Sequence, residues 1–189
     1  MMNRTILFNT KRLECATWNE GDRALAFALW GDHEVAKWIS SNGSLSEDEV
    51  EARLTQEIQR QKEVGVQYWP FFEKESEVFV GCCGLRPYSP EEDIYELGFH
   101  LTRDHWGKGY AQEAAQAVIN YAFDEKNVKA LFAGHHPDNE VSRHILIKLG
   151  FEYTGDECYE PTGKMHPSYV LRNKKSPANE GQGLRVKRC

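Results

Sequence analysis

HWGKGYAQEA, residues 105–114, is the stretch that decides how this chain folds. It contains two glycines, Gly107 and Gly109, with one residue between them. An apolar, strand-like run over residues 94–101 precedes it, and an apolar repeat of helical period follows it. A strand, a glycine loop and a helix in this order aim several backbone N–H groups at a phosphate. We therefore expect a phosphate-binding loop here, and an enzyme that uses a cofactor.

The composition is that of a soluble globular protein. The chain has 189 residues, 40% hydrophobic and 28% charged, which suits one domain with a sizeable core. Its formal net charge of −6 argues against a general nucleic-acid binder. No apolar run approaches the ~20 residues that span a bilayer, and the first residues are too short in apolar length for a signal peptide. The five cysteines include no C-x-x-C pair, which argues against a zinc site and fits a reducing compartment. We expect a cytoplasmic protein with neither membrane nor nucleic-acid partners.

Hydrophobic periodicity predicts that strands and helices alternate along the chain. Ser46 and Glu49 form a capping-box pattern, and Gly150 suits the left-handed position that ends a helix. We expect strands over 5–17, 68–73, 78–85, 94–101, 128–134, 151–154 and 168–172, and helices over 19–29, 32–39, 46–63, 107–126 and 138–149. This order implies an α/β sandwich around a mixed sheet. Residues 1–172 are expected to form a single domain, and residues 173–189 a polar, basic tail.

Three kinds of phosphate-binding loop compete for residues 105–114. A nucleotide-binding P-loop needs G-x-x-x-x-G-K-[ST], which the chain lacks. A dinucleotide loop needs a third glycine, where Gln112 stands, and an acidic residue near the end of the next strand, which instead ends in Ala133, Gly134 and His135. The third pattern, Q/R-x-x-G-x-G/A, fits with Gly109 and Ala111 at its last two positions.

The segment resembles the pyrophosphate loop of the GNAT acetyltransferases. Trp106 replaces the Gln/Arg of that motif, a departure typical of the branch that acetylates ribosomal-protein N-termini (RimJ/RimL-like). The resemblance extends from about Thr10 to Leu171, and it includes Glu96-Leu97-Gly98-Phe99, Asn139-x-x-Ser142 and Leu149-Gly150-Phe151. It implies a GNAT fold of the α/β (α+β) class. In that fold a twisted, mostly antiparallel mixed sheet is flanked by helices, and two strands splay apart at the cofactor site.

The resemblance also implies acetyl-CoA as co-substrate, and no metal. The pyrophosphate would lie on the N–H groups of residues 107–111, and the backbone of Phe99 and Leu101 would pair with the pantetheine arm. Lys108 would add a positive charge to this site, or is simply an exposed lysine at the start of the helix. The expected cofactor-binding residues are Phe99, His100, Leu101, Trp106, Gly107, Lys108, Gly109, Tyr110, Ala111, Asn139 and Ser142.

Acetyl transfer to an amine requires a base, and Glu96 is our candidate, acting through water. Strand alternation places Glu96, Gly98 and His100 on one face of the strand. The alternative for Glu96 is a purely structural role. The position where many family members carry a catalytic tyrosine holds Leu146. We therefore nominate Ser142 as the hydrogen-bond donor to the leaving thiolate. The alternative for Ser142 is a bond within its own helix.

Asn139 would hold the cofactor arm, cap its helix, or do both. Tyr159 would line the acceptor site or serve in packing. His135 and His136 suggest a metal, but adjacent histidines on a strand point to opposite faces. The charged run over residues 47–60 is interpreted as a solvated helix face.

The resemblance implies an N-acetyltransferase whose acceptor is a protein or peptide N-terminal α-amine. A small amine, such as a polyamine, an amino acid or an antibiotic-like molecule, is the alternative acceptor. A non-catalytic acyl-CoA-binding regulatory module is the alternative from another functional class. Family members occur as monomers and as homodimers, and no coiled-coil heptad decides between them.

Overall fold

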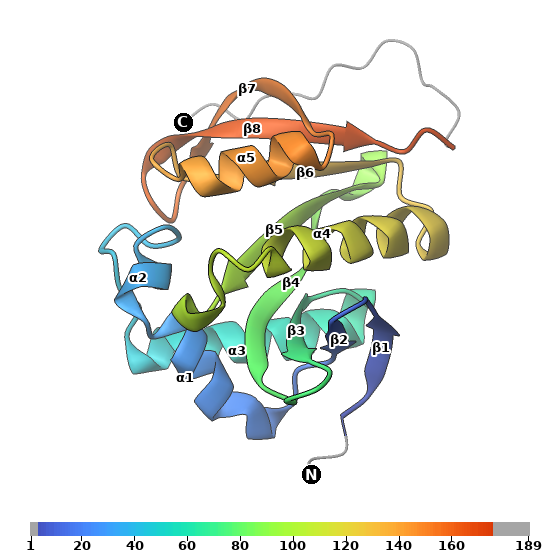
Figure 1. The fold of residues 1–189 in the computed structure, drawn as a ribbon. Helices are drawn as coiled ribbons and strands as arrows, with labels where there is room; N and C mark the ends of the chain where they lie inside the picture. Colours follow the sequence, from blue (N-terminus) through green and yellow to red (C-terminus); the bar gives the residue numbers. More distant parts are fainter. Residues whose placement is uncertain (1–3, 176–189) are drawn as a thin grey trace.

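The structure is a computed structural model, and it describes residues 4–175 (Figure 1). Most of the predicted tail, residues 176–189, lies outside the described residues. None of the helices within residues 4–175 is long and apolar enough to cross a bilayer.

Eight strands form one sheet in the described part of the chain, in the order β1-β2-β3-β4-β5-β6-β8-β7. Neighbouring strands are antiparallel except β5 and β6, which are parallel. The strands are β1 (Ile6–Asn9), β2 (Leu13–Ala16), β3 (Tyr68–Glu73), β4 (Phe79–Ser89), β5 (Ile94–Leu101), β6 (Ala130–Gly134), β7 (Glu152–Tyr159) and β8 (Lys164–Arg172). The helices are α1 (Arg23–Trp30), α2 (His33–Ala36), α3 (Glu47–Val64), α4 (Tyr110–Asn120) and α5 (Glu140–Lys148), and a π-helical turn over Tyr121–Glu125 extends α4. The expected mixed, mostly antiparallel sheet flanked by helices is confirmed.

Local signals set the ends of these helices. The Ser46 hydroxyl accepts a hydrogen bond from the Glu49 N–H, and the Glu49 carboxylate accepts one from the Ser46 N–H, which confirms the capping box of α3. Gly65 ends the same helix at φ 70°. Gly150 follows α5 at φ 87°, a left-handed conformation that glycine adopts without a steric penalty.

Several predicted elements differ from the structure in extent. Residues 5–17 form two antiparallel strands instead of one. The helix predicted from residue 107 begins at Tyr110, because Gly107 and Gly109 both have positive φ and cannot belong to a right-handed helix. Strand β4 continues to Ser89, beyond the end predicted at residue 85. Strands β7 and β8 are longer than predicted and form an extended hairpin.

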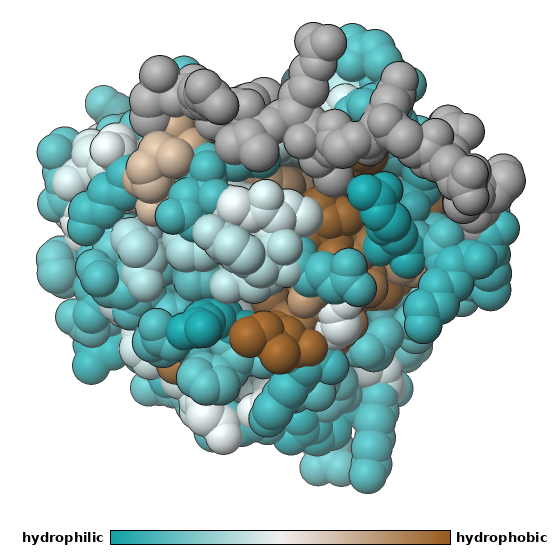
Figure 2. Space-filling model, turned by 90° about the horizontal axis from the view of Figure 1, so that it is seen from above, coloured by the Kyte–Doolittle hydropathy of each residue, from teal (hydrophilic) through white to brown (hydrophobic). Residues whose placement is uncertain are grey.

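The sheet has a separate apolar core on each face. Helices α4 and α5 pack on one face, where Leu97, Val118 and Leu146 belong to one buried cluster. Helices α1 and α3 cover the other face, where Trp30 and Leu54 belong to a second cluster. Figure 1 shows α4 crossing in front of β4 and β5. Figure 2 shows a mostly hydrophilic face whose most hydrophobic surface lies near its middle, with smaller apolar areas toward the left.

Strands β5 and β6 stay together over only part of their length. Their parallel pairing covers Ile94–Glu96 with Ala130–Phe132, whereas β5 continues to Leu101 beside β4 alone. In Figure 1, β6 and β8 turn away from β5 beyond this point. The splayed strands expected from the sequence are therefore present, and among the described residues no strand neighbours that edge of β5 beyond Glu96.

Candidate active site

A cavity of about 1390 Å³ opens where β5 and β6 separate. It extends from the loop before α4, along β5 and the start of α5, to the β7–β8 hairpin, α2 and α3. Of the predicted site residues, only Lys108 does not line it. The carbonyl of Lys108 accepts a hydrogen bond from Arg12 Nη1 at 3.0 Å. The cavity has two ends, one at the α4 loop and one at the hairpin.

The start of α4 presents to the cavity N–H groups that have no partner among residues 4–175. The first α4 amide with a helical acceptor is that of Glu113, which donates to the Gly109 carbonyl at 3.1 Å. The preceding residues Tyr110, Ala111 and Gln112 line the cavity, and helix geometry leaves their N–H groups without intrahelical acceptors. A β-carbon added to Gly107 would meet no atom within 4 Å. Glycine is therefore required at residue 107 by its φ of 72° and not by lack of space.

Trp106 ties this loop to the end of β5. Its indole Nε1 donates to the Leu101 carbonyl at 2.9 Å, although the side chain is 43% exposed. Two further contacts fix the start of α4. The Tyr110 hydroxyl donates to Glu73 at 2.6 Å, and Arg12 forms an ion pair with Glu113 at 2.7 Å.

The free edge of β5 carries backbone groups of odd-numbered residues. Thr102 N donates to the Val80 carbonyl of β4, so alternation turns the N–H and C=O groups of Leu97, Phe99 and Leu101 away from β4. His100 has the opposite orientation and pairs with Cys82 of β4 through its backbone. The predicted backbone edge at Phe99 and Leu101 therefore faces the opening. His100 faces it with its side chain only.

Glu96 lies in the cavity on the same face as Gly98 and His100. The Tyr68 hydroxyl donates to Glu96 Oε1 at 3.4 Å. Burial raises the pKa of Glu96, while the positive charges of Arg86 and Arg53 and the bond from Tyr68 act against that rise. A β-carbon on Gly98 would overlap the Tyr68 hydroxyl, so glycine at this position is what lets the tyrosine reach Glu96.

A buried carboxylate on α3 holds the surroundings of Glu96 in place. Glu57 is completely buried and accepts from Arg86 Nη2 at 2.9 Å, Arg60 Nη1 at 2.7 Å and Tyr68 N at 2.7 Å. The Arg86 guanidinium lies 4.1 Å from the centre of the Tyr68 ring. The interpretation of residues 47–60 as a solvated face was therefore wrong for Glu57. One sequence signal existed, since Glu57 continues the buried stripe of Val50 and Leu54.

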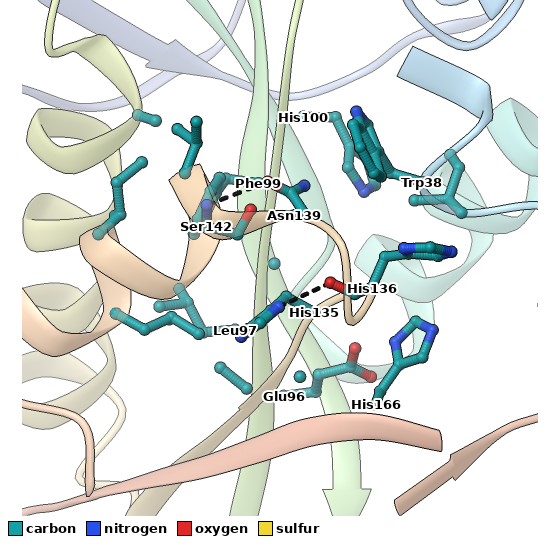
Figure 3. Close-up of a pocket in the computed structure, with 18 of the residues that line it drawn as sticks. Trp38, Glu96, Leu97, Phe99, His100, His135, His136, Asn139, Ser142 and His166 are labelled. Carbon is teal, nitrogen blue, oxygen red and sulfur yellow. Dashed lines mark hydrogen bonds between the residues drawn. The ribbon is translucent and has the colours of Figure 1, made fainter. Parts of the chain in front are cut away.

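Asn139 and Ser142 occupy the first turn of α5, across the opening from Phe99 (Figure 3). The Asn139 side chain accepts from the Ser142 N–H at 3.1 Å, which confirms its predicted capping role. Both residues line the cavity, and the Ser142 hydroxyl has no hydrogen-bond partner within residues 4–175. Leu146 is buried in the core and offers no proton donor.

Sequence reasoning named His136 and Tyr159 singly but did not bring together the aromatic and histidine side chains at the hairpin end of the cavity. His136 packs against Trp38 and His166 with ring centroids 5.4 and 5.7 Å apart, respectively (Figure 3). Residues 135 and 136 follow the last residue of β6, so the argument from strand alternation did not apply to them. His135 instead stacks on Tyr169. Over the described range, no cluster of three or more His, Cys, Asp or Glu side chains could hold a metal.

Residues 12–152 match the acetyltransferase (GNAT) domain family. The chain is 30% identical over 155 residues to the uncharacterized protein YkkB of Bacillus subtilis strain 168, covering 81% of this chain and 89% of that protein. It is 28% identical over 146 residues to the uncharacterized N-acetyltransferase p20 of Bacillus licheniformis, covering 77% and 82% of the two chains.

A solved structure of the ribosomal L7/L12 α-N-protein acetyltransferase RimL, in complex with coenzyme A, has a similar fold. Its TM-score to this chain is 0.77 at 14% identity, covering 91% of this chain and all of the RimL chain. At this identity the likeness concerns the fold.

Proposed function

This chain belongs to the acetyltransferase (GNAT) family, an acetyl-CoA-dependent family, and from this premise we propose that it acetylates an N-terminal α-amine with Glu96 as base. The observation that carries the proposal is a single cavity that joins the unpaired N–H groups of α4 to Glu96 along the free edge of β5. The protein acceptor is suggested by the similarity in fold to RimL, an α-N-protein acetyltransferase.

The residues at the α4 end suit a coenzyme A molecule. The N–H groups of residues 107–112 would hold the pyrophosphate, supported by the partial positive charge at a helix N-terminus. The backbone of Phe99 and Leu101 would pair with the pantetheine arm as an added strand, since none of the strands in residues 4–175 occupies that side of β5 beyond Glu96. Acetyl-CoA supplies the thioester whose acetyl group is transferred.

Glu96 would take the proton that the acceptor amine must lose. An α-amine has a reference pKa of about 7.7–8.0, so much of it is already neutral near that pH and a weak base suffices. As the amine nitrogen bonds to the acetyl carbon and the carbon–sulfur bond breaks, its proton passes to Glu96 directly or through one water. The Ser142 hydroxyl would donate a hydrogen bond to the departing thiolate, which then takes up a proton from solvent.

The test measures thiol release from acetyl-CoA with a panel of N-terminal peptides and small amines. Glu96→Gln is expected to lower kcat by about 10²–10⁴-fold, the usual contribution of a general base. Affinity for coenzyme A, measured by calorimetry, should stay unchanged. Glu91→Gln is the matched control, because Glu91 is an exposed carboxylate in the turn before β5 and does not line the cavity.

Unchanged turnover in Glu96→Gln would remove Glu96 from the mechanism. Acetylation of small amines only would overturn the protein acceptor. Coenzyme A binding without thiol release for any amine would identify a binding module instead of an enzyme.

A further inference from the structure

Arg53 of α3 presents a guanidinium without a partner to the hairpin end of the cavity. Within residues 4–175 it makes neither an ion pair nor a hydrogen bond, and its Nε atom is buried. Its contact is with the ring of Trp30, whose centre lies 4.9 Å from the guanidinium carbon. A guanidinium stays charged in proteins, and a desolvated charge without a counter-ion is costly. A counter-charge is therefore missing at this point of the cavity.

The carboxylates nearby cannot supply that counter-charge in this arrangement. Glu57 already accepts from Arg86 through Oε1, and from Arg60 and the Tyr68 N–H through Oε2. Three carboxylates line the cavity: Glu96, Glu157 and Glu160. Glu160 is exposed to solvent and forms no ion pair with Arg53, whereas the other two have their own donors. Tyr68 donates to Glu96 and Tyr88 donates to Glu157, and neither carboxylate is within ion-pair distance of Arg53.

The same end of the cavity therefore holds a positive group and negative groups that do not neutralise each other. Glu96 and Glu157 are suited to an amine, and Arg53 is suited to an anion. A guanidinium binds a carboxylate through two parallel N–H···O bonds, which fixes both the distance and the orientation of the bound group.

We propose that Arg53 binds a carboxylate of the acceptor, so that the preferred substrate carries an amine and a carboxylate in the same molecule. This proposal rests on the proposed acetyltransferase function and narrows its acceptor class. The acceptor could carry this carboxylate in one of two places. One is the α-carboxylate of a free amino acid, and the other is an acidic side chain beside the N-terminus of a peptide.

The test uses acceptor pairs that differ in one group. One pair is a peptide with Glu or Gln at its second position and an amidated C-terminus, and the other is a free amino acid and its amide. In at least one pair, the wild type should have a higher kcat/KM for the acceptor with the carboxylate than for the acceptor with the amide. Arg53→Gln should reduce this preference by about 10- to 100-fold. The two members of a pair differ in the basicity of their amines. This difference cancels when the preference of the wild type is divided by the preference of the variant. The pair that responds identifies the source of the carboxylate.

Two variants and a binding measurement separate recognition from structural damage. Arg53→Lys keeps the charge and should retain part of the preference. Arg23→Gln removes an exposed arginine of α1 that pairs with Glu51, outside the cavity, and should leave the preference unchanged. The acetylated carboxylate product should raise the unfolding temperature of the wild type more than its amide does, and this difference should vanish in Arg53→Gln.

Equal kcat/KM within both pairs for the wild type overturns the proposal. Equal loss for both members of a pair in Arg53→Gln also overturns it, because a structural role would act on both. If the wild type acetylates none of these acceptors or the wider panel, the acetyltransferase proposal itself fails, and the two failures are thereby distinguished.

Discussion

Replacing Glu57 by glutamine should destabilise the fold, although the two side chains have nearly the same shape. The carboxylate is completely buried and compensates Arg60 and Arg86, with hydrogen bonds of 2.7 and 2.9 Å. The amide of glutamine can still accept from the Tyr68 N–H, but it carries no charge. The change therefore leaves two partly buried guanidinium groups without their shared counter-ion.

The size of the effect follows from burial. Removing one partner of a buried ion pair costs about 3–5 kcal/mol. Arg60 and Arg86 keep 20% and 22% of their side-chain exposure, so water can solvate both in part, which favours the lower end. For a chain of this size, about 3 kcal/mol corresponds to a fall in Tm of roughly 6–12 °C.

The assay is thermal unfolding of the purified protein, followed by calorimetry or circular dichroism at neutral pH. Glu63→Gln, an exposed position on the same helix, is the control and should change Tm by little, since surface substitutions usually stay within about 0.5 kcal/mol. A Glu57→Gln Tm within about 2 °C of wild type would refute the reasoning.

An acid titration adds a second readout for Glu57. The pKa of Glu57 is lowered from its ordinary value of 4.5; burial opposes this, and the charges of Arg86 and Arg60 produce it. A depressed carboxylate contributes stability that is present above the unfolded-state pKa and is lost as pH falls through the folded-state pKa. The Tm difference between wild type and Glu57→Gln should therefore narrow on acidification below pH 4.5. A constant difference would show that charge is not the cause.

Four further outcomes are expected at the α4 loop and β5. Gly109→Ala places a β-carbon at φ 79°, which costs about 1–2 kcal/mol, and should lower Tm and coenzyme A affinity in calorimetry. Trp106→Phe loses the bond to the Leu101 carbonyl and should raise KM for acetyl-CoA about fivefold with kcat little changed. Ser142→Ala should lower kcat by less than about tenfold, since a thiolate can leave without an acid. Because burial raises the pKa of Glu96, kcat/KM should fall as pH drops through that raised pKa, and this limb should be missing in Glu96→Gln. An identical pH profile in Glu96→Gln would contradict the assignment.

Features encoded by neighbouring residues could be predicted from the sequence. The capping box at Ser46 and the left-handed glycine after α5 each depend on a few adjacent residues. The glycine loop before α4 could also be predicted, since Gly107 and Gly109 take the positive φ values that the turn into α4 requires. The predicted strand at β4 was too short, because Pro87 lacks an N–H and proline usually interrupts a strand. In the structure Pro87 pairs with Tyr95 beside a register shift, an arrangement that tolerates proline.

Apart from Tyr159, the residues at the hairpin end of the cavity could not be predicted, because distant segments bring them together. Arg53 comes from a helix whose charged sequence predicts a solvated face. Tyr68 and Arg86 come from two different strands. Their proximity depends on the pairing of β3 with β4 and on the packing of α3 against the sheet. No spacing rule in a single sequence links these positions.

Strand β5 explains why the α4 end of the cavity could be predicted from the sequence and the hairpin end could not. Its odd-numbered residues turn backbone groups toward the free edge, where nearly any side chain would leave the hydrogen bonds intact. Its even-numbered residues place side chains on the opposite part of the cavity, where Glu96 and Gly98 meet Tyr68. Under the proposed function, donor recognition would therefore rest on main-chain geometry that a short motif specifies. Under the same proposals, acceptor recognition would rest on side chains such as Arg53, which can change without disturbing the α4 end of the cavity. We therefore infer the acceptor class from the charges of this chain itself.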